Sequence, residues 1–81
     1  MTPAQCRDAR ALLDMSHFEL AGASLVPTFV IIDYEAEAVT PQRADLEAIR
    51  RAFERAGVEF VDVGGEPGVR LRLKRGGGDA D

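Results

Sequence analysis

Tryptophan is absent from this chain of 81 residues, and cysteine and histidine occur once each, as Cys6 and His17. A lone cysteine excludes an internal disulfide and a Cys-based metal cluster. One histidine beside it is too few for a structural zinc site, which takes four ligands. We therefore expect no metal and no cofactor, and we interpret Cys6 as a small buried residue rather than a reactive thiol.

Long apolar runs are also missing, because the longest stretch extends only from Phe29 to Ile32. A membrane-spanning helix needs about 20 apolar residues. The first residues of the sequence lack the basic region and the apolar run of a signal peptide. These absences predict a cytoplasmic protein that does not use a membrane.

Positive charge is missing from residues 16–40, which hold four acids and no Lys or Arg. The other ten acids balance the ten basic residues of the chain, so the net charge of −4 (10 − 14) arises wholly in this segment. Because basic side chains on phosphates supply most non-specific affinity for nucleic acids, this balance excludes indiscriminate binding. The four acids are Glu19, Asp33, Glu35 and Glu37.

The length allows one domain near the lower limit for folding on a single core, and the 46% apolar content is typical of a globular fold. Such a core leaves little room for a deep pocket, which favours a binding or regulatory module over an enzyme. We predict no catalytic residues, because no nucleophile is paired with a base and a supporting third group. We assign residues 1–75 to the domain and residues 76–81, which begin with three glycines, to a flexible tail.

Three helices are predicted from their caps and apolar spacing, over about 3–14, 16–23 and 41–56. Thr2-Pro3 and Thr40-Pro41 each place a hydroxyl cap before a proline at the first helical position. Ser16 and Glu19 have the spacing of a capping box. The clearest helical spacing is in the last of these segments, at Leu46, Ile49, Phe53 and Ala56.

Beyond Gly57 the apolar period changes from 3.6 to 2, which predicts two strands over about 58–63 and 68–74. The glycine-rich segment 64–68 is expected to form the turn of a β-hairpin. The second strand alternates apolar and basic side chains. Its basic row is either a solvated sheet face that protects an edge strand or a phosphate-binding surface.

The residues of segment 25–32 leave its structure open. Thr28, Phe29 and the Val and Ile residues that follow favour a strand. Pro27, however, can begin a helix that runs to about Glu37.

The ordered motifs resemble the Xre/Cro-repressor-like helix-turn-helix family, in particular its small bacterial members. The matching segments are residues 2–13 (TPAQCRDARALL), 16–21 (SHFELA), 34–35 with 40–41 (YE and TP), 48–60 and 68–71. The resemblance implies a mainly α domain of four helices followed by the hairpin, with the third helix over about 27–37. In this family the third helix lies in the DNA major groove, and the second crosses the backbone.

The residues expected to contact DNA depart from the family pattern. Base readout needs Arg, Lys, Asn or Gln, and family members commonly have Arg, Ser or Gln at the corresponding positions. The turn position that usually holds Gly is Leu25 in this chain. The DNA-contact candidates are His17, Thr28, Phe29, Ile32, Asp33 and Arg43.

Two functions follow from this conflict. The first is a regulator that binds double-stranded DNA sequence-specifically through indirect readout, apolar contact with thymine methyl groups and outlying basic residues. Those basic residues are Arg7, Arg10, Arg43, Arg70 and Arg72. The second is a protein-interaction or dimerisation module that does not bind DNA, with a protein partner on the third helix. Its interface candidates are Phe29, Ile32, Val69, Leu71 and Leu73.

Simpler interpretations exist for some of these residues. Phe29 and Ile32 would be core residues if the third helix were rotated or the segment were a strand. His17 would be a solvent-exposed residue at the start of its helix. Because helix-turn-helix proteins usually read two half-sites, we also expect a homodimer.

Overall fold

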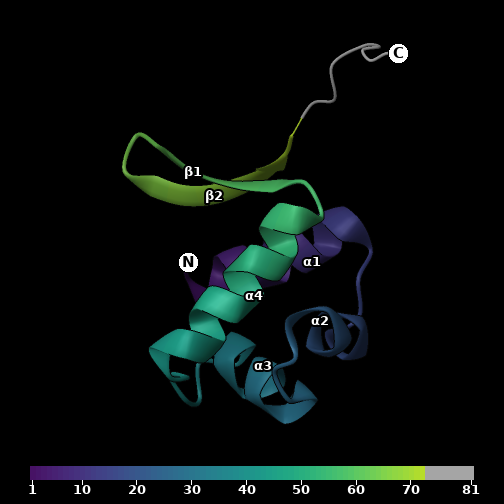
Figure 1. Ribbon diagram of the computed structural model, residues 1–81. Coiled ribbons are helices and arrows are strands. Elements are labelled where there is room, and N and C mark those ends of the chain that lie inside the picture. Colours follow the sequence, from purple (N-terminus) through teal and green to yellow (C-terminus); the bar gives the residue numbers. More distant parts are fainter. Residues whose placement is uncertain (73–81) are drawn as a thin grey trace, which may run out of the picture.

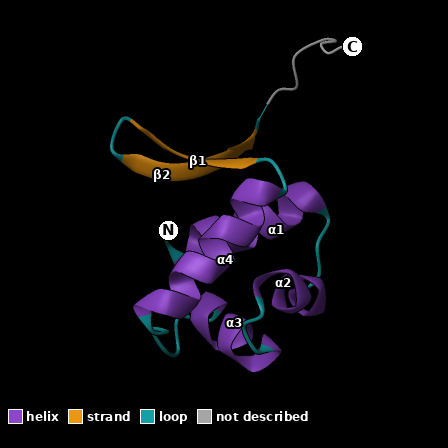
Figure 2. Cartoon of the chain, viewed as in Figure 1, coloured by secondary structure: helices purple, strands orange, loops and turns teal. Residues whose placement is uncertain are grey.

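The computed structural model describes residues 1–72, which form four helices and a C-terminal β-hairpin. The elements are α1 (Pro3–Leu13), α2 (His17–Ser24), α3 (Thr28–Glu35), α4 (Arg43–Arg55), β1 (Val58–Val63) and β2 (Glu66–Leu71). Figure 1 shows the hairpin lying across α1 and α4, with α2 and α3 at the other end of the molecule. The predicted mainly α fold with a C-terminal hairpin is confirmed, and the predicted tail at 76–81 lies outside the described residues (Figure 2).

The first two helices begin with the caps that the sequence predicts. The Thr2 hydroxyl accepts from the Gln5 amide at 3.0 Å, and the Gln5 side chain accepts from the Thr2 amide at 2.8 Å. The Ser16 and Glu19 pair repeats this reciprocal arrangement at the start of α2. Each box satisfies amide groups that the first turn of a helix leaves without partners.

The ambiguous segment is a helix, as the family resemblance implies. Ile31 and Tyr34, three residues apart, are both buried in the core, whereas strand periodicity would turn them to opposite faces. Burial of this helical stripe therefore overrides the strand propensity of the β-branched residues. The helix is shorter than the predicted 27–37, because Pro27 is its N-cap and Glu37 has a φ of 60°.

The predicted start of the fourth helix at Thr40-Pro41 is wrong. The helix begins at Arg43, and Gln42 is an N-cap without a side-chain hydrogen bond. Proline fixes φ at a value that extended connections also use, so its presence alone did not locate the first helical residue. Ile49 and Phe53 of the predicted stripe are fully buried, but Ala56 is the exposed C-cap.

The hairpin turn is tighter than predicted, and β2 begins at Glu66 instead of residue 68. Gly64 and Gly65 have φ values of 62° and 85°, which a two-residue hairpin turn with positive φ at both positions requires. Pro67 lies inside the strand opposite Asp62. The backbone N–H of Arg72 donates to the Gly57 carbonyl at 2.6 Å, so these two residues form a hydrogen-bonded pair. Hydrogen-bonded and non-hydrogen-bonded pairs alternate along an antiparallel ladder, which makes Asp62–Pro67 a non-hydrogen-bonded pair. The missing N–H of proline is therefore not needed there.

One core joins all six elements. Phe53 of α4 packs edge to face on Phe60 of β1, with 6.2 Å between the ring centroids. Gln5 on α1 donates to the Gly68 carbonyl of β2 at 2.9 Å, which attaches the second strand. The largest fully buried side chains are Phe53, Leu20, Ile31, Ile49, Val58 and Cys6.

Candidate functional site

The α2–turn–α3 unit places the candidate contact residues of α3 on its outer side. Ile31 and Tyr34 face the core, so the side of α3 away from them faces solvent. Phe29 is 67% exposed and Ile32 is 45% exposed, and one helical turn separates them. The interpretation of these two residues as core is therefore wrong. Thr28 and Asp33 are half-buried beside them.

Two further apolar residues are exposed on the same unit, and neither is among the site residues predicted from the sequence. Phe18, the second residue of α2, is 77% exposed, and Leu25, in the turn, is 88% exposed. Two features of the sequence could have pointed to them. Leu25 replaces the Gly that usually occupies such a turn, and Phe18 lies two residues from the apolar Leu20 on a short helix. We call the set Phe18, Leu25, Phe29 and Ile32 the α2–α3 surface.

Leu25 has an unfavourable backbone conformation that its own packing does not offset. It is the C-cap of α2 in the left-handed region, with φ 62° and ψ 27°. That region costs an L-residue roughly 1–2 kcal/mol. Glycine normally occupies this position because it lacks a Cβ.

We predict that Leu25→Gly stabilises the fold by about 0.5–1 kcal/mol, because relief of the left-handed strain exceeds the added entropy of an unfolded glycine. Thermal unfolding by circular dichroism should show a Tm about 2–8 °C higher. Leu12→Gly, which places glycine at another exposed leucine inside a helix, should lower the Tm. An unchanged or lower Tm for Leu25→Gly would contradict the prediction.

Glu35 is the buried member of the four acids in residues 16–40. Its side chain is 4% exposed and receives two hydrogen bonds of 2.7 Å from the Arg10 guanidinium, whose side chain is 18% exposed. Burial acts to raise the pKa of Glu35, but the bonds from Arg10, Cys6 and His17 together hold that pKa below its usual value. The exposed acids of residues 16–40 are thus fewer than the sequence suggested.

His17 and Cys6 both contact the Glu35 carboxylate, through different oxygens. His17 Nε2 lies 3.1 Å from Oε1, so this residue is half-buried against Glu35 rather than freely exposed. Cys6 Sγ donates to Oε2 at 3.1 Å, and burial is the main cause of its raised pKa. A protonated, fully buried thiol is no nucleophile, so Cys6 is the predicted core residue and the cluster holds α1, α2 and α3 together.

Most of the basic residues proposed for phosphate contact are used within the chain. Arg7 bonds to the Glu35 carbonyl and lies 3.8 Å from Glu37, and Arg10 is bound by Glu35. Arg70 and Arg72 both pair with Glu59 on the hairpin. Among these basic residues, only Arg43 makes no ion pair to another residue in the range 1–72.

The hairpin candidates lie far from the α2–α3 surface, at the opposite end of the molecule in Figure 1. Val69 pairs with Phe60 and packs against the core, whereas Leu71 is exposed. Leu73 lies outside the described residues. The two sets of interface candidates therefore belong to two separate surfaces.

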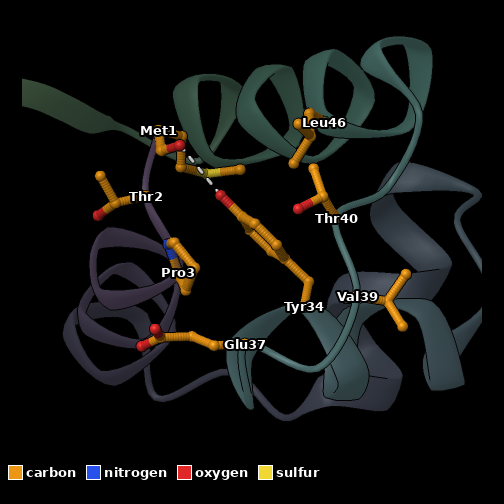
Figure 3. A pocket seen from close by; sticks show the side chains of 8 residues that line it. All are labelled: Met1, Thr2, Pro3, Tyr34, Glu37, Val39, Thr40 and Leu46. Atoms are coloured by element: carbon orange, nitrogen blue, oxygen red, sulfur yellow. Dashed lines mark hydrogen bonds between the residues drawn. The ribbon is translucent and has the colours of Figure 1, made fainter.

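An open groove of about 420 Å³ lies between the N-terminus, the end of α3 and the start of α4 (Figure 3). Its Tyr34 hydroxyl already donates to the Met1 carbonyl at 3.0 Å, and burial is the main cause that raises the Tyr34 pKa to about 12. The Tyr34 hydroxyl is therefore engaged within the fold, and Glu37 supplies the carboxylate that lines the groove. Residues 1–72 contain no group of three or more side chains placed to bind a metal ion.

In comparisons with known proteins, no family model and no curated protein matches this chain. Within residues 1–72, none of the helices has the length and apolar character that crossing a membrane requires.

Proposed function

We propose that this protein is a helix-turn-helix regulator of the Xre/Cro type whose α2–α3 surface binds a protein instead of reading DNA. The observation that carries this proposal is the outward position of Phe29 and Ile32 on α3. In a helix-turn-helix protein this side of the third helix is the contact side. Large apolar side chains exposed there favour a protein surface.

The chemistry of the surface also favours a protein over DNA. Residues 16–40 contain no Lys or Arg, so the unit has no side chain that can release counterions from phosphates. Asp33 follows Phe29 by one helical turn and would repel a phosphate row. The outlying Arg10 cannot compensate, because Glu35 holds its guanidinium.

Sequence-specific DNA binding is the second candidate function, and the α2–turn–α3 arrangement favours it. Thr28 is at the N-terminus of α3, where a helix that enters the major groove presents its first side chains. Arg43 at the start of α4 is exposed and not ion-paired within the described part of the chain. Apolar contact with thymine methyl groups would then give Phe29 a role.

Fluorescence anisotropy of labelled DNA from the protein's own upstream region separates the two functions. With an unrelated duplex as the control, we expect no binding of either DNA at tens of micromolar protein and about 50 mM salt. Binding that prefers the upstream sequence and weakens at about 200 mM salt would overturn the proposal and establish the second candidate.

A further inference from the structure

The charges around the α2–α3 surface restrict what can bind there. Asp33 has no ion pair within residues 1–72 and lies one helical turn from Phe29. Glu37 follows α3, and its 67% exposed carboxylate lies 3.8 Å from Arg7, a distance at which an exposed pair is weak. Three basic residues reach the unit from outside it: Arg10 is bound by the buried Glu35, Arg7 bonds to the Glu35 carbonyl, and Arg55 donates to the Ala23 carbonyl at the end of α2.

We infer that the partner on this surface is a protein segment with apolar side chains flanked by Lys or Arg, an inference that rests on the proposed function. Phe29 and Ile32 offer the apolar contact, and Asp33 with Glu37 offers negative charge at its side. Opposite charge at the rim of an apolar contact guides association and selects the partner.

A second copy of this chain fits the same surface poorly when the two α3 helices run parallel. Such a symmetric dimer would place Asp33 and Glu37 of one copy near the same acids of the other. Like charges facing each other across an interface are unfavourable, and residues 16–40 offer no Lys or Arg to neutralise them. The homodimer expected from the sequence would therefore not use this parallel arrangement.

The strain at Leu25 is independent support for a functional surface. A residue in a sparsely populated backbone region is a reason to suspect function when its own packing does not require it. The Leu25 side chain is 88% exposed, so it stabilises the described fold little. Its apolar contact becomes useful when a partner covers it.

The inference is tested with two labelled amphipathic peptides, both with leucines on one helical face. The other face carries lysines in the first peptide and glutamates in the second. We expect the full-length chain to bind the lysine peptide with micromolar Kd, and the glutamate peptide about tenfold more weakly or not at all. Equal or tighter binding of the glutamate peptide would overturn the inferred charge of the partner.

Matched variants show where the lysine peptide binds. Phe29→Ser with Ile32→Ser should weaken binding about tenfold or more, as the loss of central apolar anchors does. Leu25→Gly should also weaken it, although this variant is expected to be more stable, so misfolding would not explain its loss. Leu12→Ser with Val63→Ser, at other exposed apolar positions, should leave the Kd unchanged.

A second pair of variants tests whether the acids act locally. Asp33→Asn with Glu37→Gln should weaken binding of the lysine peptide. The effect should be larger than that of Asp62→Asn with Glu66→Gln, which removes the same charge from the hairpin. Equal effects would show general attraction to an acidic protein and overturn the inference. If Phe29→Ser with Ile32→Ser leaves the Kd of both peptides unchanged, the proposed protein-binding function of this surface fails as well.

Discussion

A Glu35→Gln variant is expected to lose about 3 kcal/mol of folding stability, because Arg10 would keep its charge in a largely buried place without a charged partner. A domain of this size has about 4–12 kcal/mol in total, so the loss is a large fraction. The thermal midpoint measured by circular dichroism should fall by about 12–24 °C.

The matched control is Glu37→Gln, which removes an exposed carboxylate 3.8 Å from Arg7 and should change the stability by less than about 0.5 kcal/mol. A double variant, Arg10→Met with Glu35→Leu, should recover much of the loss, since it removes both charges at once. If Glu35→Gln is as stable as Glu37→Gln, the Glu35 cluster does not hold the helices together.

The same variant should change how stability depends on pH. Because the pKa of Glu35 is lower in the folded protein than in the unfolded chain, its contribution is fully present above the unfolded pKa of about 4.3. That contribution is lost as the pH falls through the folded pKa. The stability difference between wild type and Glu35→Gln should therefore be constant above about pH 5 and shrink below about pH 4.

The elements were predictable wherever local chemistry decides them. The capping boxes at Thr2 and Ser16 bond over three residues, so the sequence alone contains both partners. The turn was harder, because five consecutive residues favour turns and only the observed φ values identify Gly64 and Gly65 as the pair that makes it. The start of α4 was missed because its N-cap, Gln42, makes no side-chain hydrogen bond that a pattern would reveal.

The site was predictable only in part, because exposure and pairing are tertiary properties. The family resemblance placed Phe29 and Ile32 on the outer side of α3, but it did not separate the half-buried Asp33 from the buried Glu35. The partner of Glu35 lies 25 residues away on α1, and no local rule connects Arg10 to it. The exposure of Phe18 depends on how α2 packs, which helical spacing alone does not determine.

The largest gain of function is expected from Thr28→Arg, Ile32→Arg and Asp33→Arg in one chain. These changes add three positive charges and remove one negative charge, which takes the formal net charge from −4 to zero (−4 + 1 + 1 + 2). On a helix that enters the major groove, three arginines would contact phosphates or guanine edges. Anisotropy with duplex DNA should then show a Kd in the range of about 1–100 μM where the wild type shows none.

The dependence on salt shows whether α3 is the element that approaches the DNA. Three new phosphate contacts should give a slope of about −2.7 in log K against log salt concentration. The matched control adds the same charge to the hairpin through Val61→Arg, Asp62→Arg and Val63→Arg, at the end of the molecule opposite α3 (Figure 1). If both triple variants bind DNA equally, the added positive charge alone explains the gained affinity, and α3 has no special access to a DNA groove. If only the α3 variant binds, the unit retains the geometry of a DNA reader, and the native Thr28, Ile32 and Asp33 are what keep it from binding DNA.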